Sequence, residues 1–160
     1  MKKKVLVVFY SLTGNTKFIA ETIRETVDAE LLEIKPIKEY NPKGMSKYVW
    51  GGMQAVMSSK PALKPINIDT STYDLIFLGT PVWAWNISPP MRSFLEKFNL
   101  NGKDVAIWLC SARKTKETFK KFKILMKDVN VVGQMNFIEP LKKDTEKIKE
   151  RVIEWTRSKL

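Results

Sequence analysis

The stretch "VLVVFYSLTGNT", residues 5–16, joins an apolar run to a loop of small polar residues. The run Val5–Phe9 has the length and composition of a buried strand. The seven residues after it are nearly all small, hydroxylated or amide-bearing, which a hydrophobic core does not require. Because a segment of helical periodicity follows, the stretch predicts a strand, a tight turn and a helix.

Two interpretations of this loop are open. Ser, Thr and Asn cap helix starts and Gly permits a tight turn, but one cap would suffice. Several hydroxyl and amide donors around a single glycine, at the positive end of a helix dipole, favour a phosphate site. The loop lacks the spacings typical of nucleoside triphosphate and dinucleotide sites, so a monophosphate ester fits better. The candidate ligand-binding residues are Ser11, Leu12, Thr13, Gly14, Asn15 and Thr16.

Length and composition indicate an ordinary globular protein. The 160 residues, 44% of them hydrophobic and 28% charged, suit a single domain covering residues 1–160. The lysine-rich start followed by an apolar run imitates a signal peptide, but the run is short and no cleavage pattern follows it. We therefore expect a cytoplasmic protein without membrane insertion, as a monomer or a weak dimer.

The chain contains one cysteine, Cys110, and no histidine. These counts exclude an internal disulfide, a Cys/His metal site and a Ser-His or Cys-His nucleophile pair. We therefore predict no metal site and no catalytic residue of these kinds.

The formal net charge is +11. It could indicate an anionic partner such as a nucleic acid or an acidic redox protein, or it could reflect solvated lysines on helix surfaces. No recognised nucleic-acid-binding module accompanies the charge, so we expect no nucleic acid partner.

Along the chain, short apolar runs alternate with segments whose apolar residues recur every three or four positions, as on one face of a helix. This alternation is a βαβ pattern. Further runs suited to strands cover residues 75–78, 105–110 and 131–138, with a weaker one at 31–34. The pattern predicts a parallel, doubly wound sheet that binds ligands at the carboxyl ends of its strands. Only residues 38–69 do not follow the βαβ pattern. In this segment, methionines at helical spacing and Trp50 surround Gly51-Gly52, which predicts a kinked helix or a functional lid.

A second unusual loop, "TPVWAWNISPP", covers residues 80–90. Trp83 and Trp85 would lie on the same side of an extended segment, at the edge of the sheet that the first loop also occupies. This arrangement suggests a flat heteroaromatic ligand, although packing of Trp83 against a helix is an equal alternative. The candidate residues are Thr80, Pro81, Val82, Trp83, Ala84, Trp85 and Asn86.

The first loop resembles the phosphate loop of the flavodoxins, and residues 79–96 are similar to their second flavin loop and the helix after it. The resemblance covers nearly the whole chain. It implies a flavodoxin-like three-layer α/β sandwich with a five-stranded parallel sheet of order 2-1-3-4-5. It also implies FMN bound without covalent attachment, with its ring between the second loop and a third loop contributed by Ser111, Ala112 and Arg113.

The third loop departs from the pattern of the family's electron carriers. Carriers typically place acidic residues and an aromatic residue near the flavin, whereas Arg113, Lys114 and Lys116 occupy this loop. Positive charge favours the reduced, negatively charged form of a flavin, but solvent can also screen it. The expected function is FMN-dependent electron transfer between redox partners, one of which is acidic. The alternatives are an FMN-dependent NAD(P)H:quinone-type oxidoreductase and an interaction module without flavin.

Overall fold

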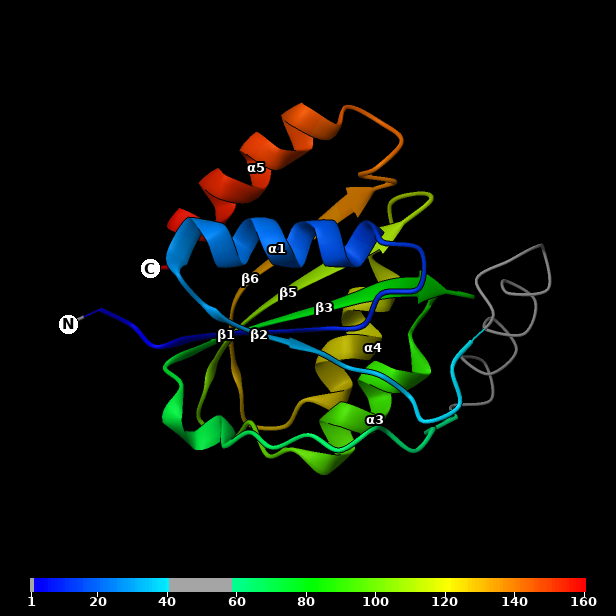
Figure 1. Ribbon diagram of the computed structural model, residues 1–160, viewed down its shortest axis with the longest axis vertical. Helices are drawn as coiled ribbons and strands as arrows, with labels where there is room; N and C mark the ends of the chain where they lie inside the picture. Colours follow the sequence, from blue (N-terminus) through cyan, green and yellow to red (C-terminus); the bar gives the residue numbers. More distant parts are fainter. Residues whose placement is uncertain (1, 41–58) are drawn as a thin grey trace.

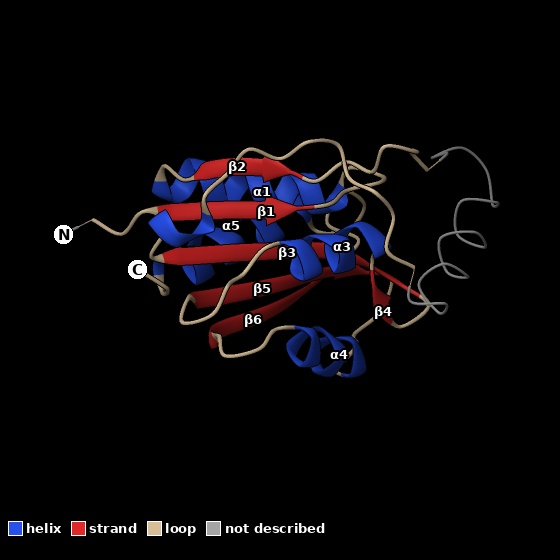
Figure 2. Cartoon of the chain, turned by 90° about the horizontal axis from the view of Figure 1, so that it is seen from below, coloured by secondary structure: helices blue, strands red, loops and turns tan. Residues whose placement is uncertain are grey.

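Five parallel strands form the central sheet of the protein, of which the computed structural model describes residues 2–40 and 59–160. The strand order is β2-β1-β3-β5-β6 (Figure 2). A short strand, β4 (Asn86–Ile87), pairs antiparallel with the end of β3. Without β4 the order is the predicted 2-1-3-4-5. The strands are β1 (Val5–Phe9), β2 (Glu30–Glu33), β3 (Leu75–Trp83), β5 (Asp104–Ser111) and β6 (Asn130–Ile138).

Both faces of the sheet are buried. Along β1, Leu6 and Val8 belong to one hydrophobic core, whereas Val5, Val7 and Phe9 belong to the other. Successive side chains of a strand point to opposite faces, so an uninterrupted apolar run supplies both cores at once. This explains why the strand lacks polar alternation.

In the described residues, four helices cover the two faces and complete three layers (Figure 1). Helices α1 (Asn15–Val27) and α5 (Thr145–Arg157) lie together on one face. Helices α3 (Pro89–Lys97) and α4 (Glu117–Leu125) cover the other. The buried side chains of each helix include those of its apolar stripe, such as Ile19 and Ile23 of α1.

The order in which successive strands are added to the sheet reverses at β1. This strand pairs with β2 on one side and with β3 on the other, parallel to both. At such a switch point the loops after neighbouring strands leave in opposite directions and open a crevice at the carboxyl edge. The expected kinked helix or lid around Trp50 falls within residues 41–58, outside the described residues. In the described ranges no helix has the length and apolar character needed to cross a membrane.

Candidate functional site

A cavity of about 330 Å³ opens at the carboxyl edge of the sheet. Four segments that follow different strands contribute to its wall, which is the arrangement expected at a switch point. Its lining consists of Leu12, Thr13, Asn15 and Thr16 after β1, Pro81, Val82 and Trp83 at the end of β3, Cys110, Ser111 and Ala112 at the end of β5, and Glu139, Leu141 and Lys142 after β6.

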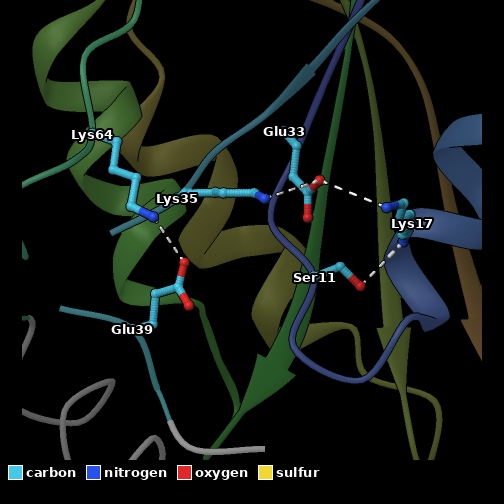
Figure 3. A network of polar contacts seen from close by, with 6 residues as sticks. All are labelled: Ser11, Lys17, Glu33, Lys35, Glu39 and Lys64. Carbon is cyan, nitrogen blue, oxygen red and sulfur yellow. Dashed lines mark hydrogen bonds and ion pairs between the residues drawn. The ribbon is translucent and has the colours of Figure 1, made fainter. Parts of the chain in front are cut away.

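The first loop takes its shape from one hydroxyl group. The Ser11 Oγ accepts hydrogen bonds from the backbone N–H groups of Gly14 and Lys17, each at 3.2 Å. Figure 3 shows Ser11 beside Lys17, whose ammonium group lies 3.9 Å from the Glu33 carboxylate. Gly14 has a φ of 97°, a left-handed conformation that glycine adopts without strain. The Ser11 side chain therefore organises the loop from within.

The groups that remain available in this loop are donors. The backbone N–H groups of Asn15 and Thr16 begin helix α1 and donate to no acceptor among the described residues. The Asn15 side chain bridges two segments, because its Nδ2 donates to Thr13 Oγ1 at 3.3 Å and its Oδ1 accepts from the Leu141 N–H at 3.0 Å. The cavity thus faces the positive end of a helix whose first N–H groups are free.

The second loop is a β-hairpin, which corrects the expected extended segment. Val82 and Trp83 of β3 pair with Ile87 and Asn86 of β4, leaving a two-residue turn. Both turn residues, Ala84 and Trp85, have positive φ values, 46° and 63°. This geometry matches the right-handed twist of the paired strands, although Asn-Gly would adopt it more easily. Trp85 leaves the strand direction, so the two tryptophans do not share a face of an extended segment.

Trp83 lies at the centre of an aromatic cluster. Its ring meets those of Tyr10 and Tyr40 edge to face, at centroid distances of 5.7 and 5.2 Å, and the two tyrosine rings are 6.1 Å apart. Trp83 is buried yet still lines the cavity. Burial also raises the pKa of Tyr40 to about 12. The sequence left open whether Trp83 packs against its neighbours or faces a ligand site. In the structure Trp83 both packs in the aromatic cluster and lines the cavity.

Trp85 has a different environment. Its side chain is 51% exposed and is not among the residues that line the cavity. Its carbonyl oxygen accepts from the Thr118 hydroxyl at 2.9 Å and from the Lys121 ammonium at 3.3 Å. These two bonds tie the tip of the hairpin to helix α4.

Cys110 forms part of the cavity floor. It is buried, and burial raises the pKa of its thiol to about 12, while a hydrogen bond with Thr16 acts in the opposite direction. A thiol with this pKa is protonated at neutral pH and is a poor nucleophile. Its contact with Thr16 joins the end of β5 to the start of α1.

The third loop contributes less to the cavity than expected. Ser111 and Ala112 line it, and the Ser111 hydroxyl donates to the Arg113 carbonyl at 2.7 Å, which closes a tight turn. Arg113 and Lys114 are exposed and are not among the lining residues. The positive charge of this loop therefore lies at the rim, in solvent.

Sequence reasoning missed the segment after β6. Glu139, Leu141 and Lys142 line the cavity, and Glu139 forms an ion pair with Lys143 at 2.9 Å. The hydrogen bond and the charge of Lys143 hold the pKa of the Glu139 carboxyl below its ordinary value. The available signal was positional: the last parallel strand also ends at the carboxyl edge.

The structure brings together nine of the sixteen candidate binding residues: Leu12, Thr13, Asn15, Thr16, Pro81, Val82, Trp83, Ser111 and Ala112. The other seven lie outside the lining: Ser11, Gly14, Thr80, Ala84, Trp85, Asn86 and Arg113. Thr80 is fully buried, and its hydroxyl binds the Ser88 Oγ at 2.8 Å and accepts from the Ser88 N–H at 2.9 Å. Ligand contact by each of the sixteen stays a prediction.

Proteins of known structure share this architecture. The chain is 28% identical to a flavoprotein of Lactobacillus acidophilus solved in complex with FMN; the match covers 89% of this chain and 99% of that one, with a TM-score of 0.74. Flavodoxin 2 of Bacillus cereus, at 20% identity, has the same fold with a TM-score of 0.58, and the match covers 98% and 99% of the two chains. An uncharacterized protein of Archaeoglobus fulgidus is 25% identical over 154 residues, 93% of this chain and 96% of its own length.

The family model described as Flavodoxin matches residues 4–155, which include all five parallel strands and the four loops around the cavity. The chain therefore belongs to the flavodoxin family.

Proposed function

We propose that this protein binds FMN in the cavity at the carboxyl edge and carries electrons between redox partners. The observation that supports the proposal most directly is the convergence of the first loop, the hairpin and the third loop on one cavity. The relative from Lactobacillus acidophilus, which was solved with FMN, supports the same choice of cofactor.

The donor set fits a phosphate monoester. The free N–H groups of Asn15 and Thr16, the exposed Thr13 hydroxyl and the Asn15 amide supply neutral donors at a helix start. Hydrogen bonds from such groups to an anion are roughly twice as strong as neutral ones. The first loop would hold the phosphate without a divalent ion.

The opposite wall fits an aromatic ring. Pro81, Val82 and Trp83 present apolar surface and strand backbone, and Ala112 adds a small residue on the other side. Bound FMN supplies the one- and two-electron chemistry. The chain's own contribution is to fix the ring against rigid strand ends and to limit its exposure to water.

A carrier also needs a docking surface for its partners. Helix α4 and the loop before it carry one arginine and five lysines, of which Lys121 is half-buried and the others are exposed: Arg113, Lys114, Lys116, Lys120, Lys121 and Lys123. Opposite charge on a partner would steer association across this surface. We therefore propose an acidic redox partner that docks over α4 and the hairpin.

The purified protein tests the proposal directly. FMN titration should give a one-to-one complex with quenched flavin fluorescence, and Thr13→Val should weaken it by about tenfold through loss of a charge-assisted bond. Thr72→Val, which removes an exposed threonine hydroxyl outside the cavity lining, serves as the matched control. Unchanged affinity in the Thr13 variant would contradict the phosphate assignment, and a protein that binds no flavin would contradict the proposal as a whole.

A specific feature favours the second candidate, an NAD(P)H-dependent reductase. Lys142 at the cavity and the arginine and lysines after β5 would attract nicotinamide phosphates. Anaerobic addition of NADPH separates the two functions. A flavin that stays oxidised, yet accepts electrons from a reduced donor protein at a rate that falls with ionic strength, supports the carrier, whereas rapid bleaching by NADPH supports the reductase.

A further inference from the structure

A second, larger cavity of about 540 Å³ lies between α3 and α4. Its volume is within the range of small-molecule sites in proteins. Leu100 and Asn101 in its wall come just before β5, and Val129 comes just before β6. It therefore lies toward the amino ends of these strands, whereas the candidate flavin site lies at their carboxyl ends.

The loop residues in the two linings come from opposite ends of the strands. A strand of eight residues, such as β5, spans about 26 Å. The two cavities also have no lining residue in common. A ligand in the second cavity would therefore not compete with FMN.

Arg92 is the exceptional residue of this cavity. Arg92 comes from α3, and the residue is only 9% exposed. Although its Nε is buried, this atom has no hydrogen-bond partner in the described part of the chain. Burial also lowers the pKa of its guanidinium. A buried charge normally has a partner, because removing a charge from water without one is strongly unfavourable.

No carboxylate of the described residues neutralises Arg92. Glu96, the one acidic residue in the cavity lining, instead forms an ion pair with Lys60 at 2.9 Å. Lys97 and Lys127 add two more exposed cations to the lining. The cations of the lining outnumber its single carboxylate, and the most buried of them, Arg92, has no ion-pair partner among the described residues.

Apart from Asn99 and Asn101, the rest of the wall is apolar. Leu95, Phe98, Leu100, Leu125, Met126 and Val129 supply it. An inorganic anion would leave this surface unused, whereas a neutral apolar molecule would leave Arg92 unpaired. The planar guanidinium matches a carboxylate, which it can bind through two parallel hydrogen bonds.

We propose that the cavity between α3 and α4 is a second ligand site, which binds an organic carboxylate with an apolar body through Arg92. The carboxylate accepts from the guanidinium, and the body packs between the two helices. The site is independent of the proposed flavin site, so either can be disproved without the other.

Octanoate is a suitable probe, because it combines a carboxylate with a short apolar chain. With the purified protein, measured both with and without added FMN, calorimetry should show octanoate binding at least about tenfold more tightly than octanamide, the matched neutral compound. Octanoate should also raise the melting temperature of the protein, as any ligand of the native state does. Equal affinity for the two compounds would overturn the proposal.

Arg92→Met removes the charge while keeping the length of the side chain. We expect it to fold, because replacing an unpaired buried cation with an apolar residue relieves a desolvation penalty. Octanoate affinity should fall at least about tenfold in Arg92→Met but less than about threefold in Lys97→Met, an exposed cation of the same lining. Unchanged binding in Arg92→Met would overturn the proposal.

A measurement on the unmodified protein tests the location. Octanoate should shift the backbone amide resonances of residues 95–101 and 125–129 and leave those of residues 11–16 in place. Shifts confined to the first loop would place the anion at the phosphate site and overturn the inference. Inorganic phosphate, added at the same concentration, should not reverse the octanoate shifts.

Discussion

The first loop and the hairpin line the same cavity, and in each of them one hydroxyl group organises the backbone. Ser11 does so in the first loop, where it is half-buried, and Thr80 does so at the base of the hairpin, where it is fully buried. Water can replace the bonds of an accessible hydroxyl, but not those of a buried one. The hairpin is therefore a fixed wall, while the first loop keeps free donors for a ligand.

The largest expected difference concerns the two tryptophans of the hairpin. Trp83→Ala removes the centre of the aromatic cluster and should lower the free energy of unfolding by about 3–5 kcal/mol. Trp85→Ala removes a side chain that is 51% exposed and should change it by less than about 0.5 kcal/mol. Urea unfolding of the FMN-free proteins measures both. Similar losses in the two variants would contradict the assignment of Trp83 to the packed core and of Trp85 to the exposed tip of the hairpin.

The two organising hydroxyls give the next effect. Thr80→Val leaves the Ser88 N–H and hydroxyl without their buried partner, which should cost about 1–3 kcal/mol of unfolding free energy. Ser11→Ala should cost less, because water can reach the N–H groups of Gly14 and Lys17. Thr80→Ser, which keeps the hydroxyl, is the matched control and should recover most of the loss. A larger cost for Ser11→Ala would reverse the comparison.

The sequence was sufficient for the fold because the responsible patterns are local. Runs such as Val5–Phe9 indicate strands buried on both faces, and the Ile19 and Ile23 stripe indicates a helix on the sheet. The strand order came from the family resemblance. It could not come from these patterns alone, because register and order depend on contacts between distant segments.

The site was predicted less completely. Loops at the carboxyl edge were identified by composition, but composition does not distinguish a hydroxyl that binds a ligand from one that holds a backbone. In this structure the hydroxyls of Ser11 and Thr80 both hold backbone groups, and whether either also contacts a ligand stays a prediction. The hairpin was missed because Ala84-Trp85 lacks the glycine or asparagine typical of its turn. Glu139 and Lys142 were missed because no motif marks the segment after β6.

Gly14 offers a way to separate loop shape from loop stability. An added Cβ would lie 3.3 Å from Leu141 Cδ1, and the φ of 97° is unfavourable for alanine. Gly14→Ala should therefore cost about 1–2 kcal/mol of unfolding free energy and also weaken FMN binding. Gly102→Ala is the matched control: its φ is 75°, and no atom lies within 4 Å of the added Cβ.

We expect the two glycine variants to lose comparable stability while only the Gly14 variant loses FMN affinity. Fluorescence titration with FMN, combined with urea unfolding, gives both quantities. Normal FMN affinity in Gly14→Ala would show that FMN binding tolerates a change in the shape of the first loop. The first loop would then differ from the hairpin more than their shared use of one organising hydroxyl suggests.

The smallest effect concerns pH and the segment after β6. The pKa of Glu139 is lowered in the folded protein, chiefly by its hydrogen bond and ion pair with Lys143. A carboxyl whose pKa is lower in the folded state stabilises that state above the ordinary pKa of glutamate, about 4.3, and this contribution is lost as the pH falls through the lowered value. Glu139→Gln should therefore reduce the melting temperature slightly at neutral pH, and the difference from the unmodified protein should shrink as the pH falls below about 4.3. Glu154→Gln, on the exposed side of α5, is the control, because Glu154 forms no ion pair with the described residues. If both variants lose the same amount at neutral pH, the ion pair adds nothing to stability, and Glu139 is better understood through its place in the cavity wall.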